Sequence, residues 1–408
     1  MKALFTCLPG FGHFLPMVSL ARATAGAGHD VAFATAADFC PRVDAAGFRA
    51  FPAGISLPDQ LDRAGRRYEE ANLPPGKERF ESFVPRMLAG VAAPPRAADL
   101  VPIIEDWHPD LLVHDETEFG GPVAATITGV PYADQSVGML RPLEMSRLAG
   151  RTLAPLAEEW GVDVGEFGGL FQYLYLDVCP PSLQPREIGW IAVAHPVHNL
   201  SVAGRGGDGL PPWVSDLPSD PTVYVSLGTI FNRDPHVLAA IVEGVREERV
   251  NVIVTVGPDN DPGALGTQPP NVHVERYIPQ PELLPHCDFV VNQGGTAMLD
   301  ILGQGLPILV LPQGANQFHN AEACVSRGAG RSLMPGEISP ESVRREMRIL
   351  LEEPSYRIAA RQVRDEFGLM PGPEQGVALL ERLADERAPL VREAIRGAGG
   401  ITDHEPPG

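Results

Sequence analysis

The first 35 residues hold two short apolar segments on either side of a helical one. Residues 2–8 (KALFTCL) and 30–35 (DVAFAT) favour strands, and residues 14–25 between them follow a helical pattern that ends at Gly28. A strand, a helix and a strand within so short a length are typical of a βαβ unit, whose strands run parallel. Residues 111–114 add a further apolar strand segment. The sequence therefore predicts an α/β fold built on a parallel sheet.

The same alternation begins again in the second half of the chain, after a segment rich in glycine, proline and aspartate. Strands are expected there at residues 222–227, 250–256, 272–274, 289–291 and 308–311, and a helix at 235–246. A chain of 408 residues exceeds what one hydrophobic core usually supports, so two domains are expected. The expected parts are an N-terminal domain (1–202), an interdomain linker (203–221), a C-terminal domain (222–376), an amphipathic helix that can pack back on the N-terminal domain (377–396) and a disordered tail (397–408).

Two insertions do not belong to a minimal α/β sheet. Residues 56–95 are irregular, with charges, prolines and aromatic residues, and residues 139–175 are helical and rich in aromatic residues. Both are candidates for a wall that faces a substrate, although helices that merely cap the core explain any single residue equally well.

The net charge of −20 limits the partners of the chain. Nucleic acids and anionic membranes are bound through a positive field, so neither is expected as a partner. A nucleotide remains compatible with an acidic protein, because local helix dipoles can hold a diphosphate.

The cysteines and the apolar runs indicate the compartment. The five cysteines are Cys7, Cys40, Cys179, Cys287 and Cys324. Their number is odd and none form a CxxC pair, so buried free thiols in a reducing cytosol are expected. The apolar run at residues 3–8 is too short for a signal peptide, and no run approaches the roughly 20 residues of a membrane-spanning helix. We therefore expect a cytoplasmic protein.

Residues 290–320 (VVNQGGTAMLDILGQGLPILVLPQGANQFHN) carry the strongest functional pattern of the chain. A buried strand leads into a glycine turn, a helix start, a second buried strand and a polar loop. The turn leaves free backbone N–H groups at the start of a helix, which suits a phosphate. The polar loop, residues 313–317, follows a strand at the same sheet edge and offers carboxamides. Together the two loops can hold a diphosphate and a polar group such as a sugar.

Several motifs follow one another along nearly the whole chain. They are Gly12–His13 with Pro16, HDETEFGGPVAA (114–125), VYVSLGT (223–229), TVGPDNDP (255–262), YIPQ (277–280) and LPQGANQFHNA (311–321). In this order they resemble the motifs of family 1 glycosyltransferases of the GT-B fold, the actinobacterial enzymes that glycosylate natural products. The resemblance implies two Rossmann-like parallel-sheet domains that face each other across a cleft. It also implies that the C-terminal domain binds a nucleotide-sugar donor and the N-terminal domain an apolar small-molecule acceptor.

The resemblance implies a role for particular residues. His13 would be the general base and Asp115 its partner. The implied donor-binding residues are Gly12, Ser226, Gly228, Thr229, Tyr277, Ile278, Gln280, Gln293, Gly294, Gly295, Thr296, Asn316 and Gln317. No metal ion and no other cofactor is implied.

The sequence context of His13 and Asp115 is compatible with these roles. A helix N-terminus disfavours imidazolium, so His13 is expected to be neutral and able to take a proton from an acceptor hydroxyl. Capping of the helix is the alternative role for His13. Asp115 follows a strand of the same sheet and can hold one ring nitrogen of His13. His114 and Glu116 are alternative partners, and a solvated loop acid is the other interpretation of Asp115.

Three donor-site positions depart from the family pattern, and a fourth bears on the nucleotide. Gln293 stands where histidine is usual, Met298 where a serine or threonine reaches the phosphate, and Asn316 where aspartate is usual. Gln293 and Thr296 can still donate hydrogen bonds, so the site keeps its backbone N–H groups and loses some side-chain donors. Ile301 occupies the position of a ribose-binding glutamate in users of uridine diphosphate. An apolar side chain cannot bind a 2′-hydroxyl, so we expect thymidine diphosphate as the nucleotide.

Two further patterns are incomplete. The Gly10-x-Gly12 pattern is similar to the dinucleotide fingerprint, but Leu15 stands where its third glycine belongs. Asp259–Asn260–Asp261 is similar to the DxD metal motif of the other glycosyltransferase fold, yet turns favour Asp and Asn for their own reasons. Neither a dinucleotide nor a metal ion is therefore expected.

The sequence thus predicts an inverting glycosyltransferase of antibiotic biosynthesis. It would move a deoxysugar from thymidine diphosphate to a hydroxyl group of an apolar secondary metabolite. The alternative is a catalytically weak homologue that serves as an auxiliary or binding subunit. The altered donor positions favour that alternative, and the retained His13 and Asp115 disfavour it. A nucleotide-sugar epimerase on the same fold is a third hypothesis, and a homodimer is left open.

Overall fold

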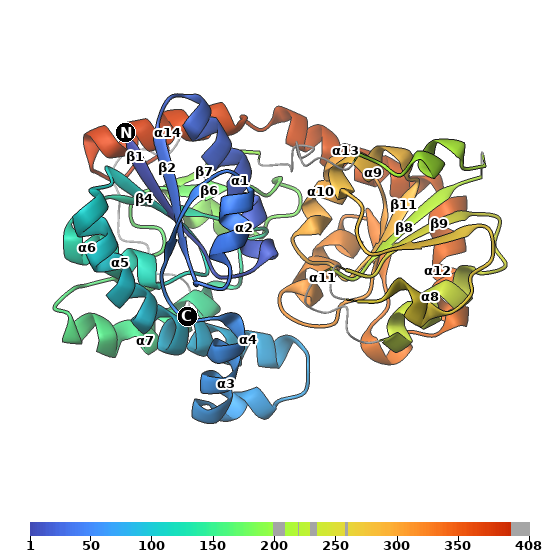
Figure 1. Cartoon of the computed structure of the whole chain (residues 1–408), viewed down its shortest axis with the longest axis horizontal. Coiled ribbons are helices and arrows are strands. Elements are labelled where there is room, and N and C mark those ends of the chain that lie inside the picture. The colour runs from blue at the N-terminus through green and yellow to red at the C-terminus, as the bar shows by residue number, and fades with distance from the viewer. Residues whose placement is uncertain (199–208, 219, 229–234, 258–259, 393–408) are drawn as a thin grey trace.

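Two α/β domains lie side by side in the computed structural model, which describes residues 1–198, 209–218, 220–228, 235–257 and 260–392 (Figure 1). Each domain contains a parallel sheet with helices packed around it. The prediction of an α/β fold with two parallel-sheet domains is therefore confirmed.

The N-terminal domain has a seven-stranded sheet in the order β3-β2-β1-β4-β5-β6-β7, with all neighbours parallel. Its strands are β1 (Lys2–Thr6), β2 (Asp30–Thr35), β3 (Arg49–Pro52), β4 (Leu111–Asp115), β5 (Tyr132–Gln135), β6 (Tyr175–Asp177) and β7 (Ala194–Pro196). Its helices are α1 (Phe11–Gly26), α2 (Cys40–Ala45), α3 (Leu57–Arg67), α4 (Lys77–Met87), α5 (Ala93–Trp107), α6 (Gly120–Thr128) and α7 (Leu143–Glu159). Strand β4 is buried along its whole length, as expected for a sheet covered on both faces.

The C-terminal domain has a six-stranded parallel sheet in the order β10-β9-β8-β11-β12-β13. Its strands are β8 (Thr222–Ser226), β9 (Asn251–Thr255), β10 (Val272–Glu275), β11 (Phe289–Asn292), β12 (Ile308–Val310) and β13 (Gly330–Ser332). Its helices are α8 (Pro235–Val245), α9 (Gln280–Leu283), α10 (Ala297–Gly303), α11 (Gln317–Ser326), α12 (Pro340–Glu352) and α13 (Pro354–Leu369). The expected series of strands stops at β12. It omits the edge strand β13 because the residues of that strand, GRS, include no large apolar side chain.

The strand order reverses between β1 and β4 in the first sheet, and between β8 and β11 in the second. Loops that leave such neighbouring strands at their carboxyl ends diverge to opposite faces of the sheet, and α/β proteins bind ligands in the crevice between them. The loop after β1 leads into the first turn of α1, which contains His13, and the loop after β4 contains Thr117; the loops after β8 and β11 contain Gly228 and Gln293. Both pairs of loops therefore lie where this topology favours a site.

The first insertion is helical and not irregular. Helix α3 begins after Ser56, whose hydroxyl oxygen accepts a hydrogen bond from the backbone N–H of Asp59 (3.2 Å). Pro58 lies in the first turn of that helix, where no backbone N–H is needed. A π-helical turn, η2 (Leu88–Ala92), joins α4 to α5. The prolines that suggest a loop are thus accommodated at a helix start and beside a π turn.

The continuous helical run at residues 77–107 is also relevant to the membrane prediction. By length and composition alone, this one run among the described residues is apolar enough to cross a membrane. A run of this kind is not expected from the count of consecutive apolar residues, because charged residues interrupt it. Within its most apolar window, 61% is buried inside the protein, and a core helix passes the same test, so a single such run is weak evidence.

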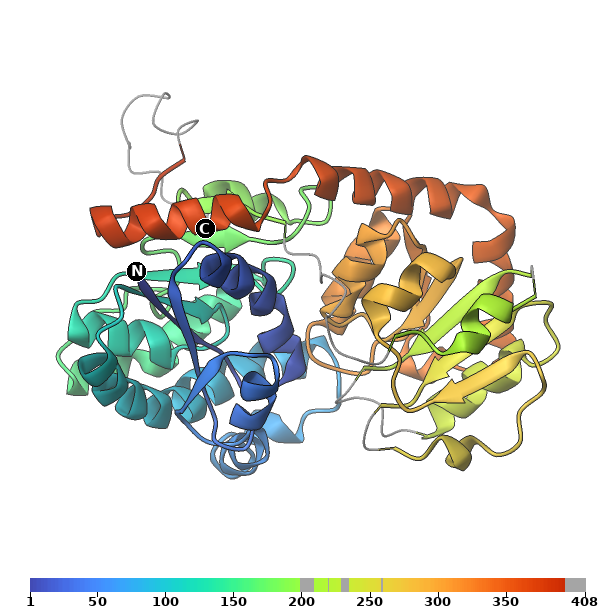
Figure 2. The ribbon, with the colours of Figure 1, turned by 45° about the horizontal axis from the view of Figure 1, so that its top comes forward.

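The last helices connect the two domains. Helix α13 packs against α10, and α14 (Pro373–Glu386) crosses to the N-terminal domain, where it packs along α1 (Figure 2). Leu380 and Leu383 of α14 share a buried cluster with Phe14. The chain then returns to the N-terminal sheet region, where the N–H of Leu390 donates to the carbonyl of Tyr173 (2.7 Å). The final helix thus starts earlier and ends earlier than the expected range 377–396, and the expected tail lies outside the described residues.

The domains also meet at a second place, between α4 and α11. Lys77 forms an ion pair with Glu322, and His319 Nε2 lies 2.9 Å from Glu81 Oε1. The described part of the expected linker belongs to the C-terminal core, since Val214 is buried in the same cluster as Tyr224. The rest of that linker lies outside the described residues.

Asp177, the last residue of β6, is a buried carboxylic acid. Its Oδ1 accepts hydrogen bonds from the side-chain amide of Gln184 (2.6 Å) and the N–H of Cys179 (3.0 Å). Burial outweighs these bonds and raises the pKa of Asp177 to about 7. The unfolded chain releases this proton at about pH 4. Between about pH 4 and 7 the folded state therefore binds more protons than the unfolded state, and this carboxyl lowers the folding stability as the pH rises.

We expect Asp177→Asn to remove this dependence, because the asparagine oxygen can still accept both hydrogen bonds. The variant should be more stable than the wild type at pH 8. The difference between their free energies of unfolding should grow by up to about 3 kcal/mol between pH 5 and pH 8. Urea unfolding at the two pH values measures this difference, and Asp106→Asn, at an exposed aspartate, is the control. A stability gap that is equal at both pH values would show that Asp177 does not titrate in this range.

Candidate active site

His13 and Asp115 come from the two neighbouring strands at which the first sheet reverses its order. His13 lies in the first turn of α1, and Asp115 is the last residue of β4. His13 Nδ1 lies 3.0 Å from Asp115 Oδ2. The Asp115 side chain is fully buried, whereas 30% of the His13 side chain is exposed. When Nδ1 donates to the carboxylate, the other ring nitrogen carries the lone pair that can take a proton from a ligand.

Thr117 completes this cluster. Its hydroxyl donates to Asp115 Oδ1 (2.5 Å) and lies 3.1 Å from His13 Nδ1, and its backbone N–H donates to the same Oδ1 (2.7 Å). The N–H of Leu8 donates to Oδ2 (3.2 Å). Burial alone would raise the pKa of the Asp115 carboxyl, but the charge and hydrogen bond of His13 and the bonds from Thr117 hold it well below its usual range. The motif search missed Thr117, although an aspartate followed two residues later by threonine is typical of such local side-chain to backbone bonds.

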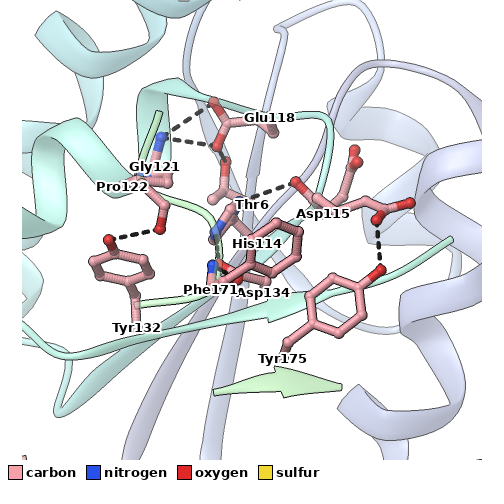
Figure 3. Close-up of polar contacts among 12 residues, drawn as sticks. Thr6, His114, Asp115, Glu118, Gly121, Pro122, Tyr132, Asp134, Phe171 and Tyr175 are labelled. Carbon is pink, nitrogen blue, oxygen red and sulfur yellow. Dashed lines mark hydrogen bonds and ion pairs between the residues drawn. The ribbon is translucent and has the colours of Figure 1, made fainter. Parts of the chain in front are cut away.

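The two alternative partners of His13 point elsewhere. His114 is fully buried, with Nε2 2.6 Å from Asp134 Oδ1 and Nδ1 3.0 Å from the backbone oxygen of Asp115 (Figure 3). Although burial lowers the pKa of His114, the hydrogen bond and charge of Asp134 raise it overall. The other oxygen of Asp134 accepts from the N–H of Phe171 (2.6 Å), a residue with a left-handed φ of 66°. His114 therefore holds the end of β4 and the Phe171 loop in place and does not contact His13.

Glu116 lies on the other side of the loop and faces a pocket in the N-terminal domain. The pocket contains about 350 Å³ of empty space, open solvent at its mouth included. Its walls come from both insertions that the sequence singled out and from the loop after β4, and they include Val84, Leu88, Phe119, Met145, Leu170 and Phe171. Glu116 and Arg141 are the charged residues of this lining. An apolar pocket thus begins one residue from Asp115.

On the C-terminal side, Asn292 shapes the glycine turn after β11. Its Oδ1 accepts from the N–H of Gly294 (2.8 Å), and its Nδ2 donates to the backbone oxygen of Ser226 (3.0 Å). Gly294 has a φ of 83°, which favours glycine. The N–H groups of Gly295 and Thr296 have no hydrogen-bond acceptor among the described residues. The motif search missed Asn292, which ties the turn after β11 to the loop after β8.

Gln293 is packed inside this turn. Its side chain is 8% exposed and its amide nitrogen lies against Gly228, where the side chain of any other residue would collide with it. Gly228 also has a φ of 72°. The Gln293 Oε1 atom is buried and has no hydrogen-bond partner among the described residues. A buried acceptor without a partner is costly, so this oxygen can be satisfied by a ligand group that donates a hydrogen bond, such as a hydroxyl.

The two halves of the site face each other at Gly12 and Thr296. A side chain added at Gly12 would place its Cβ 3.5 Å from Thr296 Oγ1. The start of α1, with His13, therefore abuts the start of α10, with the unpaired N–H groups of the glycine turn. This contact places the histidine beside the turn that the sequence assigns to a phosphate.

The polar loop before α11 is held by its own glutamine. Gln317 Oε1 accepts from the N–H groups of Gln313 (2.7 Å) and Gly314 (2.9 Å), so the oxygen is already used and the amide N–H₂ remains. Ala315 has a left-handed φ of 52°, an uncommon conformation for alanine that occurs at ligand-binding loops. Asn320 Nδ2 donates to the carbonyl of Gly294 (2.7 Å), which joins this loop to the glycine turn. Asn316 precedes the helix and makes no side-chain cap.

The remaining donor-site positions differ in exposure. Tyr277 is 69% exposed, and Gln280 begins α9. The side chain of Ile278 is 2% exposed and belongs to the core of the C-terminal domain. Met298 and Ile301 are likewise buried in that core, so neither offers a group to a ligand. Thr229 lies outside the described residues.

The DxD-like segment has a structural role where it is described. Asp261 caps a short helix by accepting from the N–H of Gly263 (3.1 Å), and Asn260 Nδ2 donates to the carbonyl of Val256 (2.7 Å). Asp259 lies outside the described residues. No cluster of three metal-ligating side chains occurs in the part of the chain that the structure describes.

Comparisons with known proteins agree with this geometry. The family models described as erythromycin biosynthesis protein CIII-like match the chain over residues 22–228 for the N-terminal domain and 238–383 for the C-terminal domain. An L-demethylnoviosyl transferase of Streptomyces niveus is 32% identical, over 96% of this chain and 100% of the relative. Among solved structures, the Streptomyces sp. SF2575 glycosyltransferase SsfS6 in complex with thymidine diphosphate superposes with a TM-score of 0.79, at 26% identity over 94% of this chain and 99% of that chain. The Streptomyces nogalater glycosyltransferase SnogD superposes with a TM-score of 0.73, at 27% identity over the same shares.

These matches decide between the hypotheses drawn from the sequence. The relatives and the structural neighbours are transferases, which supports an enzyme and not an auxiliary subunit or an epimerase. The family models cover well over half of the chain, and both sheets have the arrangement of GT-B enzymes. The chain is therefore a glycosyltransferase of the GT-B fold and belongs to the erythromycin biosynthesis protein CIII-like family of antibiotic biosynthesis.

Proposed function

We propose that this glycosyltransferase is an inverting enzyme that moves a deoxysugar from thymidine diphosphate to a hydroxyl group of an apolar natural product. The observation that carries the proposal is the buried His13–Asp115–Thr117 cluster beside Thr296 at the start of α10. A base with a carboxylate behind it and an anion-binding turn in front of it suits displacement of a diphosphate by a hydroxyl group.

The reaction follows from the roles of these groups. The acceptor oxygen attacks the anomeric carbon of the sugar from the face opposite the diphosphate, while His13 takes the hydroxyl proton. The bond between the anomeric carbon and the phosphate oxygen breaks, and its electron pair leaves with the diphosphate, so the anomeric configuration inverts. The Asp115 carboxylate stabilises the imidazolium that forms and keeps the ring in the required tautomer.

The donor is held by the C-terminal domain. The free N–H groups of Gly295 and Thr296 and the amide N–H₂ of Gln293 would donate hydrogen bonds to the diphosphate, so the protein itself supplies donors for the leaving group. The amides of Asn316 and Gln317 would bind sugar hydroxyls, and the exposed ring of Tyr277 would stack on the base. Thymidine diphosphate in SsfS6 supports the nucleotide, and the core position of Ile301 leaves no polar side chain there for a 2′-hydroxyl.

We propose that the enzyme works in the cytoplasm. All five cysteines are free. Burial raises the pKa of Cys287 and of Cys324 to about 12, so these thiols stay protonated and unreactive, as fits a reducing compartment.

His13→Ala should lower turnover by roughly 10²- to 10⁴-fold, because it removes the general base, while diphosphate binding stays unchanged. Asp115→Asn should also lower turnover, because the imidazolium loses the charge that faces it. Steady-state kinetics measure both, and calorimetry with thymidine diphosphate checks the donor site. The exposed His286→Ala is the matched control. Normal turnover in His13→Ala would remove His13 from the mechanism.

Thr117→Val should lower kcat by roughly 10- to 100-fold at constant donor KM, because Asp115 loses a charge-assisted hydrogen bond. Thr117→Ser keeps the hydroxyl and should restore most of the rate. The same loss should raise the pKa of the Asp115 carboxyl from its position well below the usual range, so the carboxylate is less stable as an anion at low pH. A pH–rate profile of the three proteins measures this. Equal rates and profiles in Thr117→Val and the wild type would show that the hydroxyl does not act on the dyad formed by His13 and Asp115.

Gln293→Ala should weaken thymidine diphosphate binding by roughly 10- to 150-fold, the loss of one hydrogen bond to a charged phosphate, with little effect on thymidine itself. Gln293→His should preserve or improve binding. Calorimetry measures each affinity, with the exposed Gln304→Ala as control. Unchanged diphosphate affinity in Gln293→Ala would mean that the backbone N–H groups alone hold the phosphate.

A further inference from the structure

The pocket that begins at Glu116, the residue after Asp115, is lined mostly by apolar side chains. Its walls are aliphatic and aromatic side chains from α4, α7 and the loop before β6, and its charged members are Glu116 and Arg141. A charged pair inside an apolar pocket is costly to desolvate, so its presence there calls for an explanation.

Glu116 is fully occupied by protein groups. One oxygen lies 3.2 Å from an Arg141 nitrogen and 3.5 Å from the N–H of Val137, and the other accepts from the hydroxyl of Tyr175 (2.8 Å). The side chain is only 4% exposed, so little of the carboxylate is left for a ligand. Glu116 therefore serves to hold Arg141.

Arg141 is not satisfied in the same way. A guanidinium carries five N–H donors in a fixed fork. Among the residues that the structure describes, Arg141 has an ion pair with Glu116 and no other hydrogen-bond partner. Its side chain is 16% exposed, so water reaches it poorly. The remaining donors have no protein acceptor among the described residues and are therefore available to a ligand in the lined space.

The position of Arg141 is tied to the dyad through the backbone. Glu116 follows Asp115 directly, and its N–H donates to the carbonyl of Gln135 on the neighbouring strand β5 (3.0 Å). The carboxylate that pairs with His13 and the carboxylate that pairs with Arg141 are thus adjacent residues on one anchored segment. A ligand held by Arg141 would therefore lie at a fixed position relative to His13.

We infer that Arg141 selects acceptors that carry a carbonyl or ionised phenol oxygen on an otherwise apolar ring system, and that it orients their reactive hydroxyl toward His13. This inference rests on the proposed function, since it names the acceptor class of the same site. The Glu116–Arg141 pair is close to neutral as a whole, so the recognised group is an oxygen that accepts hydrogen bonds and need not bear a full charge. The apolar walls bind the ring system, and the guanidinium supplies the orientation.

The test compares two bicyclic phenols that differ by one carbonyl group, hydroxytetralone and hydroxytetralin. Both present the same reactive hydroxyl, so the ratio of their affinities measures the contribution of the carbonyl group to binding. The full-length wild type should bind hydroxytetralone roughly 10- to 100-fold more tightly, the range for a hydrogen bond to a charged group. Arg141→Met should bring this ratio close to one.

Three further variants control for a folding defect and for a general effect of charge. The double variant Glu116→Gln with Arg141→Met leaves no unpaired buried charge and should also lose the preference, whereas Glu116→Gln alone should keep it. Arg147→Met is the matched control, because Arg147 pairs with Glu144 (2.6 Å) and Glu166 (2.5 Å) and does not line the pocket. It should bind both phenols as the wild type does.

Titration calorimetry with each phenol, and separately with thymidine diphosphate, distinguishes the inference from the proposed function. A wild-type ratio near one, a ratio retained in Arg141→Met, or no binding of either phenol would overturn the role of Arg141, even if thymidine diphosphate binds normally. Failure of thymidine diphosphate to bind would instead refute the proposed donor, and the phenol ratio would still decide the role of Arg141. The preference for hydroxytetralone in the wild type and in Arg147→Met, together with its loss in both Arg141→Met variants, is the result expected.

Discussion

The buried carboxylate of Asp115 is the interaction on which the candidate active site depends. A charge fully removed from water is stable only where donors fill its oxygens. Leu8 and Thr117 supply backbone N–H groups, Thr117 adds its hydroxyl, and His13 adds a ring nitrogen. Leu8 follows β1 and Thr117 follows β4, so the carboxylate joins the two strands at which the sheet order reverses. The place of His13 is thus set by the sheet topology as well as by its own helix.

The C-terminal domain repeats this layout with neutral side chains. Asn292 joins the loops after β8 and β11, as Asp115 joins those after β1 and β4, but it uses a carboxamide for both bonds. Gln293 extends the same chemistry and leaves one buried oxygen without a partner. A carboxylate beside the base and uncharged amides beside the leaving group suit their tasks, because an imidazolium needs a negative neighbour and a diphosphate does not. The carboxylate of Asp115 is fully bonded within the protein, whereas the donor half still has polar atoms for a ligand to satisfy.

Contacts between helices far apart in the sequence decide how the two halves meet. Helix α14 leaves the C-terminal domain and packs along α1, the helix that carries His13. Helix α4 supplies the Val84 wall of the pocket and pairs with α11, the helix that begins at Gln317. The acceptor pocket and the polar donor loop are therefore linked through one helix pair. Movement of either domain would change the distance between the two proposed substrates.

The sequence by itself determined the α/β class, both parallel sheets, the order of the motifs and the family, because strand and helix periodicity and loop motifs are local properties of the chain. It also named His13 and Asp115 together, but it left His114 and Glu116 open as partners. Only the tertiary structure decided which of these three meets His13, because neighbouring residues at a strand end point to different sides. The tertiary structure likewise decided that the side chain of Ile278 lies in the core of the C-terminal domain. It also brought Arg141 against Glu116, since such contacts depend on which strands lie next to each other, and no local pattern records that.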